Sequence, residues 1–579
     1  MSVGYLTTGG MTALIGFNHR GDYSQLLAGT VGRLSHDRFE LELFRHVEPP
    51  GETTQSWSVL KLSDDLAHKC MSEALDDMLD ILQDPPLPDK FIPGWPGHTD
   101  LIPILLDPIR HESLIKFHRS DVIANLEFLN TDLDDKQKEA VRHALSAQHV
   151  ALVLGPPGTG KTTVLLEIVH QLAKQNMKVL VCASSNASVD LLFERLVLQE
   201  TQCMRLGSAR KSRHGHLGQW LLDVQLLNGP SGQLISQLRS FLRNVLSKKK
   251  KDYLREAQRI REELAQLELA GFSELIQHTP VLVSTLVGAG CDGLRNHCFD
   301  AVVIDEAYSA LEPECWIAIG RGKRLVMAGD THLLPPMVWS RSPVLEVTLF
   351  KRLLMALPRI IYTLEQQYRM NKSIMDFSSQ YLYQHRIVAN QGIAHHLLSD
   401  LPQVEDGDLT CLPLVFLNTS NTGIRESSNN GPKWNAGEAN LVAVHLNHLI
   451  SAGVKEETIG IISLYNAQVE ILRSMLLPNH PALQVGTVET FQGSEKEAII
   501  ISLVRSNPLN QVGFLRDYRR LNVATTRARR HLCIVGDGET IMGTSNFNTR
   551  DCYTNLNFLP ALGKYIDTQG DTWLPEMYI

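Results

Sequence analysis

The fold of this chain is decided by the stretch Gly155-Pro156-Pro157-Gly158-Thr159-Gly160-Lys161-Thr162-Thr163. It directly follows the apolar run 149–154 and directly precedes the helix-forming run 164–173. Glycines let the backbone curl so that successive N–H groups and the start of a helix point at one place, where a phosphate group can bind. The stretch therefore predicts a phosphate-binding loop between a buried strand and a helix, with all nine residues around the nucleotide.

Two side chains of this loop have the chemistry that a nucleoside triphosphate requires. Lys161 supplies a positive charge to the phosphates, and Thr162 offers its hydroxyl to a magnesium ion. A glycine-rich turn that binds no nucleotide is the alternative interpretation, and the complete pattern in its strand–loop–helix context disfavours it. We therefore expect ATP and Mg2+ as ligands.

Two adjacent acidic residues stand at the expected end of a buried strand. Asp305 and Glu306 directly follow the apolar run 301–304, and ligands of such sheets bind at the carboxyl ends of strands. Asp305 is expected to hold magnesium through its water shell, and Glu306 to be the base that polarises the attacking water. Two acids after an apolar run are by themselves more often a surface turn, but their position downstream of a phosphate loop favours the catalytic interpretation.

Cations are also needed, because catalysis of phosphoryl transfer consists mostly of positioning and electrostatic stabilisation. Arg369 in the run 367–370 and Arg527 in the run 522–530 are the candidates. Arginines that come from a second domain would make hydrolysis depend on domain closure. Spacing alone is a weak signal for both, since exposed arginines that pair with acids are common.

Buried strands alternate with amphipathic helices from about residue 131 onward, which is typical of parallel α/β sheets. A first set of strands is expected at 149–154, 179–182, 281–284, 301–304 and 325–328, and a second at 414–417, 459–462, 483–488, 498–503 and 532–535. Two sets predict two domains, at 131–357 and 358–579.

A polar stretch at 209–270 interrupts the first domain. Its apolar residues Ala257, Ile260, Leu264 and Leu267 recur at spacings of three and four, which predicts an inserted helical hairpin. The basic run 248–251 within it is more often a solvated helix face than a phosphate contact.

The start of the chain has a different texture. Phe39, Leu41 and Leu43 alternate with acidic residues, which predicts small antiparallel β structure, and the spacing becomes helical at 62–82. Prolines and glycines between 85 and 97 then break regular structure. We expect an accessory domain with a stalk helix at 1–84 and a linker or helical segment at 85–130.

Composition limits the class of protein. With 43% apolar and 20% charged residues, the chain is typical of globular proteins. It shows neither a membrane-spanning run nor a signal peptide, so we expect a cytoplasmic or nuclear protein without a membrane partner. The nine cysteines lack paired spacing, so neither disulfides nor zinc are expected. The net charge of −8 points to no polyanion, so any nucleic-acid site must consist of local contacts.

Taken in order, these motifs resemble those of superfamily-one helicases of the Upf-like branch, most closely the immunoglobulin mu-binding protein type. The resemblance covers roughly residues 130–545. The similar positions are Gln137, the phosphate loop, Ser185-Asn186, Val189-Asp190, Thr285, Asp305-Glu306-Ala307, Gly329-Asp330, Leu334-Pro335-Pro336, 367–370, Tyr465-Asn466, Gln468, Phe491-Gln492-Gly493, Glu495, 504–507, 519–524 and 526–530.

The resemblance implies an α/β fold with two RecA-like domains, ATP in their cleft, and a small N-terminal β-barrel on a helical stalk. Gln137 would read the adenine edge, Tyr368 would stack on the base, and Glu495 would approach the ribose or phosphates. The positions implied for single-stranded RNA or DNA are Ser185, Asn186, Thr285, Pro336, Thr487, Ser506 and Asn507. Such backbone contacts carry no sequence information, as a translocating protein requires.

Several positions depart from the family pattern. Leu333 stands where the family usually has a glutamine that senses the γ-phosphate, and leucine cannot form a hydrogen bond with water or phosphate. Ser184 replaces a proline, Glu489 an aspartate and Tyr308 a smaller residue. The change at 333 predicts weakened hydrolysis, or weakened coupling to strand movement, with ATP binding retained.

The expected function is that of a monomeric ATP hydrolase that moves 5′ to 3′ on single-stranded RNA or DNA and unwinds duplexes. An ATP-gated nucleic-acid clamp with weak hydrolysis is the alternative, and a small-molecule kinase would leave Arg369 and Arg527 unexplained. Basic residues after the second strand either reinforce the grip on the strand or form a solvated loop; they are Arg205, Arg210, Lys211 and Arg213.

Overall fold

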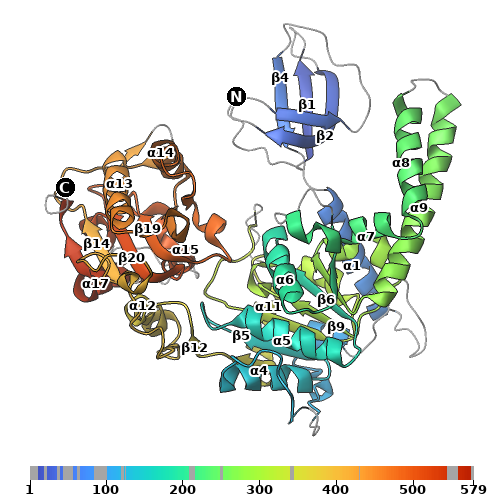
Figure 1. Cartoon of the computed structure of the whole chain (residues 1–579), viewed down its shortest axis with the longest axis horizontal. Coiled ribbons are helices and arrows are strands. Elements are labelled where there is room, and N and C mark those ends of the chain that lie inside the picture. Colours follow the sequence, from blue (N-terminus) through green and yellow to red (C-terminus); the bar gives the residue numbers. More distant parts are fainter. Residues whose placement is uncertain are drawn as a thin grey trace. The chain divides into compact units, whose positions relative to one another are not determined.

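The protein is known from a computed structural model, and its parts are shown in Figure 1. The structure describes residues 11–17, 23–34, 39–43, 56–61, 65–83, 101–118, 123, 125–207, 215–247, 252–338, 344–428, 431–543 and 558–575. The chain divides into two compact units, Met1–Leu87 and Pro88–Ile579. Both predicted α/β domains lie in the second unit.

The first unit contains a four-stranded antiparallel sheet in the order β3-β2-β1-β4. Its elements are β1 Met11–Phe17, β2 Tyr23–Leu34, β3 Phe39–Leu43, β4 Ser56–Lys61 and the following helix α1 Asp65–Gln83. The alternating residues of the sequence form β3, where Leu41 pairs with Val31 of β2. Antiparallel β structure followed by a helix is thus confirmed, whereas the barrel stays a prediction.

A seven-stranded sheet in the order β11-β5-β10-β9-β6-β8-β7 forms the first α/β domain, and all its paired strands are parallel. Its strands are β5 Val150–Leu154, β6 Val179–Ala183, β7 Cys203–Arg205, β8 Val281–Thr285, β9 Ala301–Ile304, β10 Leu325–Gly329 and β11 Ile361–Thr363. All five predicted strands are present. Strand β11 pairs with β5, so this sheet extends past the expected boundary at 357.

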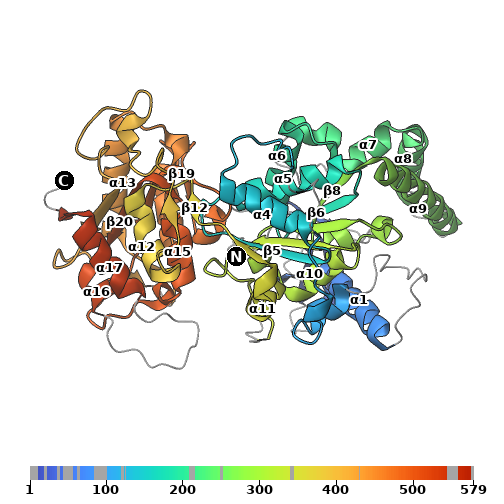
Figure 2. The same cartoon turned by 90° about the horizontal axis from the view of Figure 1, so that it is seen from below.

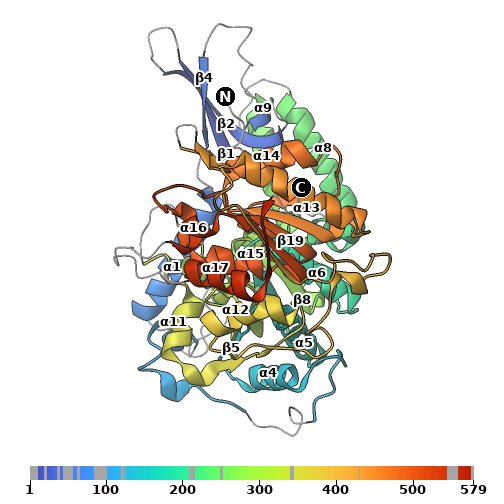
Figure 3. The ribbon, with the colours of Figure 1, turned by 90° about the vertical axis from the view of Figure 1, so that its left-hand side faces the viewer.

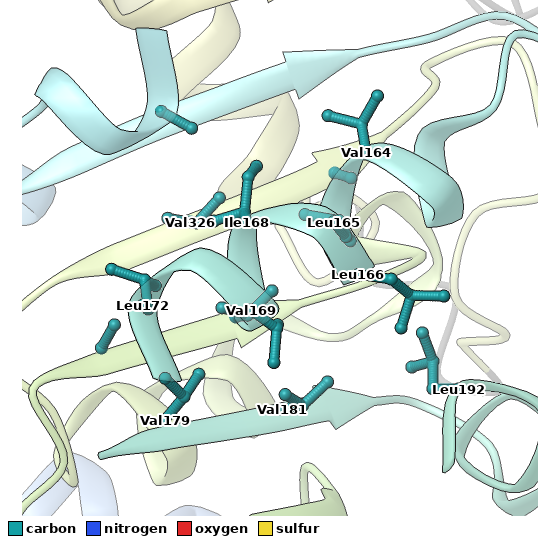
Figure 4. Packing of buried hydrophobic residues seen from close by; sticks show 14 of the residues in the cluster. Val164, Leu165, Leu166, Ile168, Val169, Leu172, Val179, Val181, Leu192 and Val326 are labelled. Atoms are coloured by element: carbon teal, nitrogen blue, oxygen red, sulfur yellow. The ribbon is translucent and has the colours of Figure 1, made fainter. Parts of the chain in front are cut away.

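Helices cover both faces of this sheet (Figure 2). On one face lie α4 Asp135–Ser146, α5 Lys161–Lys174 and α6 Asn186–Leu198, and on the other α10 Glu312–Ile319 and α11 Leu349–Ala356. Figure 4 shows Val169 and Leu172 of α5 close to Val181 and Val179 of β6, all within one buried cluster. Coverage on both faces explains why these strands are continuous apolar runs rather than alternating ones.

The predicted helical hairpin is confirmed (Figure 1) and follows β7. It comprises α7 Leu222–Asn228, α8 Gly232–Ser247 and α9 Asp252–His278, so it continues beyond the expected end at 270. Ala257, Ile260 and Leu264 are buried against apolar residues of α8, as their spacing predicted. The basic run 248–251 lies outside the described residues.

The second α/β domain is a six-stranded parallel sheet in the order β18-β17-β19-β20-β14-β21. Its strands are β14 Leu414–Asn418, β17 Ile459–Ser463, β18 Gln484–Gly486, β19 Lys496–Ser502, β20 Ala528–Gly536 and β21 Asp571–Trp573. Strand β18 is shorter than the predicted 483–488, because the backbone turns into a 3-10 helix at Val488–Phe491.

Helices also cover both faces of the second sheet (Figure 3). One face carries α13 Ala436–Ser451 and α14 Asn466–Leu476; the other carries α12 Lys372–Leu382, α15 Tyr518–Thr525 and α17 Phe558–Gln569. The short pair β12 Gln366–Gln367 and β13 Val388–Ala389 lies between the two sheets in sequence. Among the described residues, no helix is both long enough and apolar enough to span a bilayer.

Candidate nucleotide site and nucleic-acid contacts

The phosphate loop connects β5 to α5, as predicted. Gly158 and Gly160 have φ angles of 79° and 83°, in the left-handed region that favours glycine. A Cβ atom on Gly158 would lie 2.8 Å from the Cβ of Arg369, so glycine is also required there for space. The backbone N–H of Gly155 donates to the carbonyl of Gly329 at 3.1 Å, which ties the start of the loop to β10.

Thr162 and Asp305 lie together, although they are far apart in sequence. The Thr162 hydroxyl donates to Oδ2 of Asp305 at 2.9 Å, and Oδ1 of that carboxylate accepts the backbone N–H of Glu306 at 2.8 Å. Hydroxyl and carboxylate oxygens are the ligands that Mg2+ prefers. The two side chains therefore fit the expected metal site, with phosphate oxygens and water to complete it.

Lys161 is half-buried at the start of α5. Its ammonium donates to the carbonyl oxygens of Gly155 and Pro156, the latter at 3.1 Å. Burial lowers the pKa of Lys161 to about 8, although the nearby Asp330 and Asp305 oppose this shift. The lysine is thus positioned beside the loop with a charge that titrates close to physiological pH.

Glu306 is half-buried at the end of β9 and has a φ of 52°, which is uncommon for a residue other than glycine. Its Oε2 accepts a hydrogen bond from the Ser188 hydroxyl at 2.7 Å. Burial, together with the negative charge of Asp305, raises the pKa of Glu306. Strained backbone and a raised carboxyl pKa are features that cluster at functional sites.

Arg369 lies beside the phosphate loop. The neighbouring Tyr368 backbone N–H donates to the carbonyl of Gly158 at 2.8 Å. The Arg369 guanidinium forms an ion pair with Glu495 at 2.5 Å and donates to the Thr526 carbonyl at 3.1 Å. The structure therefore brings Arg369 to the loop and connects it to the second domain.

Arg527 is buried two residues after the end of α15. It donates to the carbonyl oxygens of Val523 at 2.9 Å and Ser494 at 3.3 Å. Burial and the nearby charge of Arg369 lower the pKa of Arg527 to about 10. Both arginines are thus held by fixed partners from the second domain.

Gln137 caps α4 and also binds the loop. It forms a capping box with Asp134, and its Nε2 donates to the Thr159 carbonyl at 3.0 Å. The Tyr368 hydroxyl donates to Oδ2 of the same Asp134 at 2.5 Å. Glu495 pairs with Arg369 and Arg529, and these cations lower its pKa although burial opposes them. The predicted nucleotide-binding residues therefore gather around the loop.

The residues predicted for nucleic acid divide into two groups. Ser185 and Asn186 are exposed at the start of α6. Thr285, the last residue of β8, and Thr487, directly after β18, are half-buried. Pro336 is buried, in contrast to the expectation of a strand contact.

Ser506 also differs from the expectation. It is buried, and its hydroxyl lies 2.7 Å from the Asp537 carboxylate. The Asn507 amide donates to Glu426 at 3.1 Å. In this conformation the Ser506 hydroxyl is directed into the protein, because its hydrogen-bond partners are the Asp537 carboxylate and the Ile424 carbonyl.

Arg205 cannot reinforce the grip on a strand as it lies here. It is 1% exposed and forms a buried ion pair with Asp190 at 2.6 Å. A further nitrogen of its guanidinium donates to the Asn186 side chain at 3.2 Å. Its sequence neighbours Arg210, Lys211 and Arg213 lie outside the described residues.

A buried polar cluster that sequence reasoning missed connects the two domains. Asp330, fully buried after β10, accepts hydrogen bonds from the Tyr383 hydroxyl at 2.7 Å and the His332 backbone at 3.0 Å. Asn522 of α15 donates to the His332 carbonyl at 2.9 Å. Asp330 and Asn522 lie in stretches that resemble the family, but no role was predicted for either; Tyr383 and Ser188 belong to no motif that marks their distant partners.

The departures from the family pattern have defined surroundings. Leu333 is 7% exposed, so it presents no surface to a strand. Ser184 lies 3.1 Å from the Ser309 hydroxyl, and Glu489 pairs with Arg520 at 3.0 Å. Tyr308 is buried, with its hydroxyl 3.5 Å from the Gln492 amide of the second domain.

Known families and proteins are similar to this chain over most of its length. Two family models, both described as "AAA domain", match residues 132–228 with 233–341 and residues 345–539. "DNA polymerase alpha-associated DNA helicase A" of Saccharomyces cerevisiae is 32% identical over 90% of this chain and 80% of its own length. "ATP-dependent helicase upf1" of Schizosaccharomyces pombe is 32% identical over 72% of this chain and 46% of its own length.

"DNA-binding protein SMUBP-2" of Rattus norvegicus is 35% identical over 96% of this chain and 56% of its own length. This chain therefore spans little more than half of that relative. Among solved structures, the Arterivirus nonstructural protein 10 helicase is 13% identical, and the match covers 72% of this chain and 63% of that protein's chain. Its TM-score of 0.34 is too low to support any inference. The ordered motifs, the two parallel sheets and the curated relatives together show that this chain belongs to the Upf1-like branch of the superfamily-one helicases.

Proposed function

We propose that this chain hydrolyses ATP between its two α/β domains and uses the cycle to move 5′ to 3′ along single-stranded RNA or DNA. The proposal rests on one observation: a lysine, two acidic residues and two arginines lie around the phosphate loop. Lys161 and the acids Asp305 and Glu306 come from the first domain, while Arg369 and Arg527 are held by partners in the second. Two of the relatives reported above are named as helicases, which supports the same activity for this chain.

The proposed chemistry assigns one task to each group. The loop N–H groups and Lys161 bind the phosphates, while Thr162 and Asp305 hold Mg2+, which neutralises phosphate charge when bound. Glu306 takes a proton from water as the water oxygen forms a bond to the γ-phosphorus and the bond from that phosphorus to the bridging oxygen of ADP breaks. Arg369 and Arg527 stabilise the charge on the transferring group.

Coupling to movement is proposed to follow from contacts that join the domains. The Tyr368 backbone N–H donates a hydrogen bond to the Gly158 carbonyl, and the Asn522 side-chain amide donates one to the His332 carbonyl. A change at the γ-phosphate therefore has a direct route to the second domain. Alternating grip at the exposed Ser185 and Asn186 turn and at Thr487 would convert opening and closing into steps.

The test is ATP turnover with and without single-stranded RNA or DNA. We expect stimulation by a strand, and a fall of about 10²–10⁴-fold in the Glu306→Gln variant with ATP binding retained, because a general base is lost. Glu314→Gln is the matched control. Burial also raises the pKa of Glu314, but this glutamate lies on α10 and not at the phosphate loop. Absence of stimulation by both strands, or normal turnover in Glu306→Gln, would defeat the proposal.

Direction and substrate are tested with partial duplexes. A duplex with a 5′ single-stranded overhang is expected to be unwound, and one with a 3′ overhang is not. The same pair made of RNA and of DNA shows which strand is used, because the proposed contacts are to the backbone and do not themselves discriminate.

A second candidate function is an ATP-gated clamp that grips nucleic acid but hydrolyses ATP poorly. Leu333 is the observation that favours it, since this buried side chain has no polar atom to offer to the γ-phosphate. Under this candidate, Leu333→Gln raises strand-stimulated turnover many-fold, whereas Leu334→Gln, the same change one residue on, does not. Unchanged turnover in Leu333→Gln would remove the clamp from consideration.

A further inference from the structure

A chain of hydroxyl groups connects the surface of the first domain to Glu306. The hydroxyls of Ser185 and Ser188 lie 2.8 Å apart, and that of Ser188 lies 2.7 Å from Oε2 of Glu306. Ser185 is exposed at the start of α6, whereas Ser188 and Glu306 are half-buried. The chain therefore joins a solvent-accessible group to the proposed base.

The number of hydrogens fixes the direction of these bonds. A serine hydroxyl has one hydrogen to donate, and an ionised carboxylate only accepts. Ser188 must therefore donate to Glu306, and Ser185 must donate to Ser188. The Ser185 oxygen in turn accepts the backbone N–H of Ser188 at 3.0 Å. Its single hydrogen is thus directed inward, away from solvent.

A second contact ties the same turn to the backbone of Glu306. The Ser309 hydroxyl donates to the Glu306 carbonyl at 2.9 Å and lies 3.1 Å from the Ser184 hydroxyl. Glu306 has the strained φ of 52° at this point. The turn 184–188 therefore contacts Glu306 at its carboxylate directly and at its backbone through Ser309, so a change in the turn reaches the base.

We propose that Ser188 is a positioning residue that restrains Glu306 until a nucleic-acid strand occupies the turn at Ser185 and Asn186. This inference rests on the proposed function. A strand phosphate accepts hydrogen bonds but donates none, so it takes the Ser185 hydrogen away from Ser188. Bonds in a chain polarise one another, and the remaining bond from Ser188 to Glu306 then weakens. The carboxylate is thereby released toward the water that it activates.

The proposal predicts a gain of activity in the absence of a strand. In Ser188→Ala the restraint is absent, and turnover without nucleic acid is expected to rise about tenfold, the effect of one charge-assisted hydrogen bond. The ratio of stimulated to unstimulated turnover falls accordingly. Ser185→Ala is expected to raise unstimulated turnover and to lower this ratio in the same way. Ser188→Thr keeps a hydroxyl and is expected to match the wild type, and Ser474→Ala, which removes a hydroxyl from α14, is the control.

The split between kcat and KM separates this role from a merely structural one. The side-chain hydrogen bonds of Ser188 go to Ser185 and Glu306, so its loss frees the base without removing a group proposed to bind the nucleotide. Ser188→Ala is therefore expected to raise the kcat measured without a strand while the KM for ATP stays close to that of the wild type. Ser188→Thr is expected to restore the wild-type kcat.

The outcomes distinguish this inference from the proposed function. If neither RNA nor DNA stimulates the wild-type chain, both fail. If a strand stimulates the wild type but Ser188→Ala shows no rise in unstimulated turnover, the inference alone fails. A fall in turnover with loss of thermal stability in Ser188→Ala, with Ser185→Ala unchanged, also overturns it.

Discussion

Single residues in the proposed nucleotide site owe their chemistry to burial. Lys161 and Arg527 are positive charges withdrawn from water, and burial lowers the pKa of each, to about 8 and about 10. Asp305 lies in the same environment, and burial raises its pKa. The site thus holds opposite charges whose ionisation depends on one another, which suits it to a ligand that carries both phosphate and magnesium.

The affinity for ATP is expected to fall in alkaline solution. Lys161 is protonated below its pKa of about 8 and neutral above it, so the bond to phosphate loses its charge as pH rises. The Kd for ATP is expected to increase by about tenfold per pH unit above that value. Calorimetric titration from about pH 7 to about pH 9.5 measures it. Lys161→Arg keeps its charge and should show no such slope, and a flat wild-type curve would contradict the expectation.

Helix α15 is the element that relates the two domains. Asn522 within it contacts the loop after β10, while Arg527 follows its end. The Tyr383 hydroxyl of the segment after α12 connects Asn522 to Asp330. The end of β10 and the position of Arg527 are therefore linked through one buried polar cluster, formed by Asp330, Tyr383 and Asn522. Such a cluster is stable only when every polar group in it has a hydrogen-bond partner.

Removal of the Tyr383 hydroxyl is expected to weaken this connection. Tyr383→Phe leaves the buried Asp330 carboxylate without one of its donors, which lowers the free energy of unfolding by about 1–3 kcal/mol. The kcat should fall several-fold while the Kd for ATP changes little, because Tyr383 does not contact the phosphate loop. Tyr565→Phe, which removes a hydroxyl bonded to the Ser373 carbonyl, controls for stability alone. Equal kcat in both variants would show that the cluster is not needed for turnover.

At the scale of the whole molecule, all parts of the proposed nucleotide site lie in the unit Pro88–Ile579. Each of its two sheets is buried by helices of the same unit, so its cores do not require the N-terminal sheet. A unit with its own cores is able to fold independently.

A chain of residues 88–579 is accordingly expected to be folded and to hydrolyse ATP with a kcat close to that of the full chain. Thermal unfolding and ATP turnover without nucleic acid measure this. Strand affinity, measured in parallel, shows whether the first unit contributes to binding. An insoluble or inactive 88–579 chain would contradict the expectation.

Local patterns in the sequence were sufficient for the main elements. The loop between β5 and α5, and the acids at the end of β9, involve neighbouring residues, so their composition and burial pattern predict them directly. Strands β7, β11 and β21 were missed because three residues are too short for a periodic pattern.

Tertiary structure alone decided which distant segments meet. Ser188 reaches Glu306, Tyr383 reaches Asp330, and Arg205 is buried against Asp190 rather than presented to a strand. The sequence by itself determined the family, the parallel sheets and the principal charges of the site. Which polar atoms are free for a ligand was settled only by packing, because a hydrogen bond is set by distance in space and not by separation along the chain.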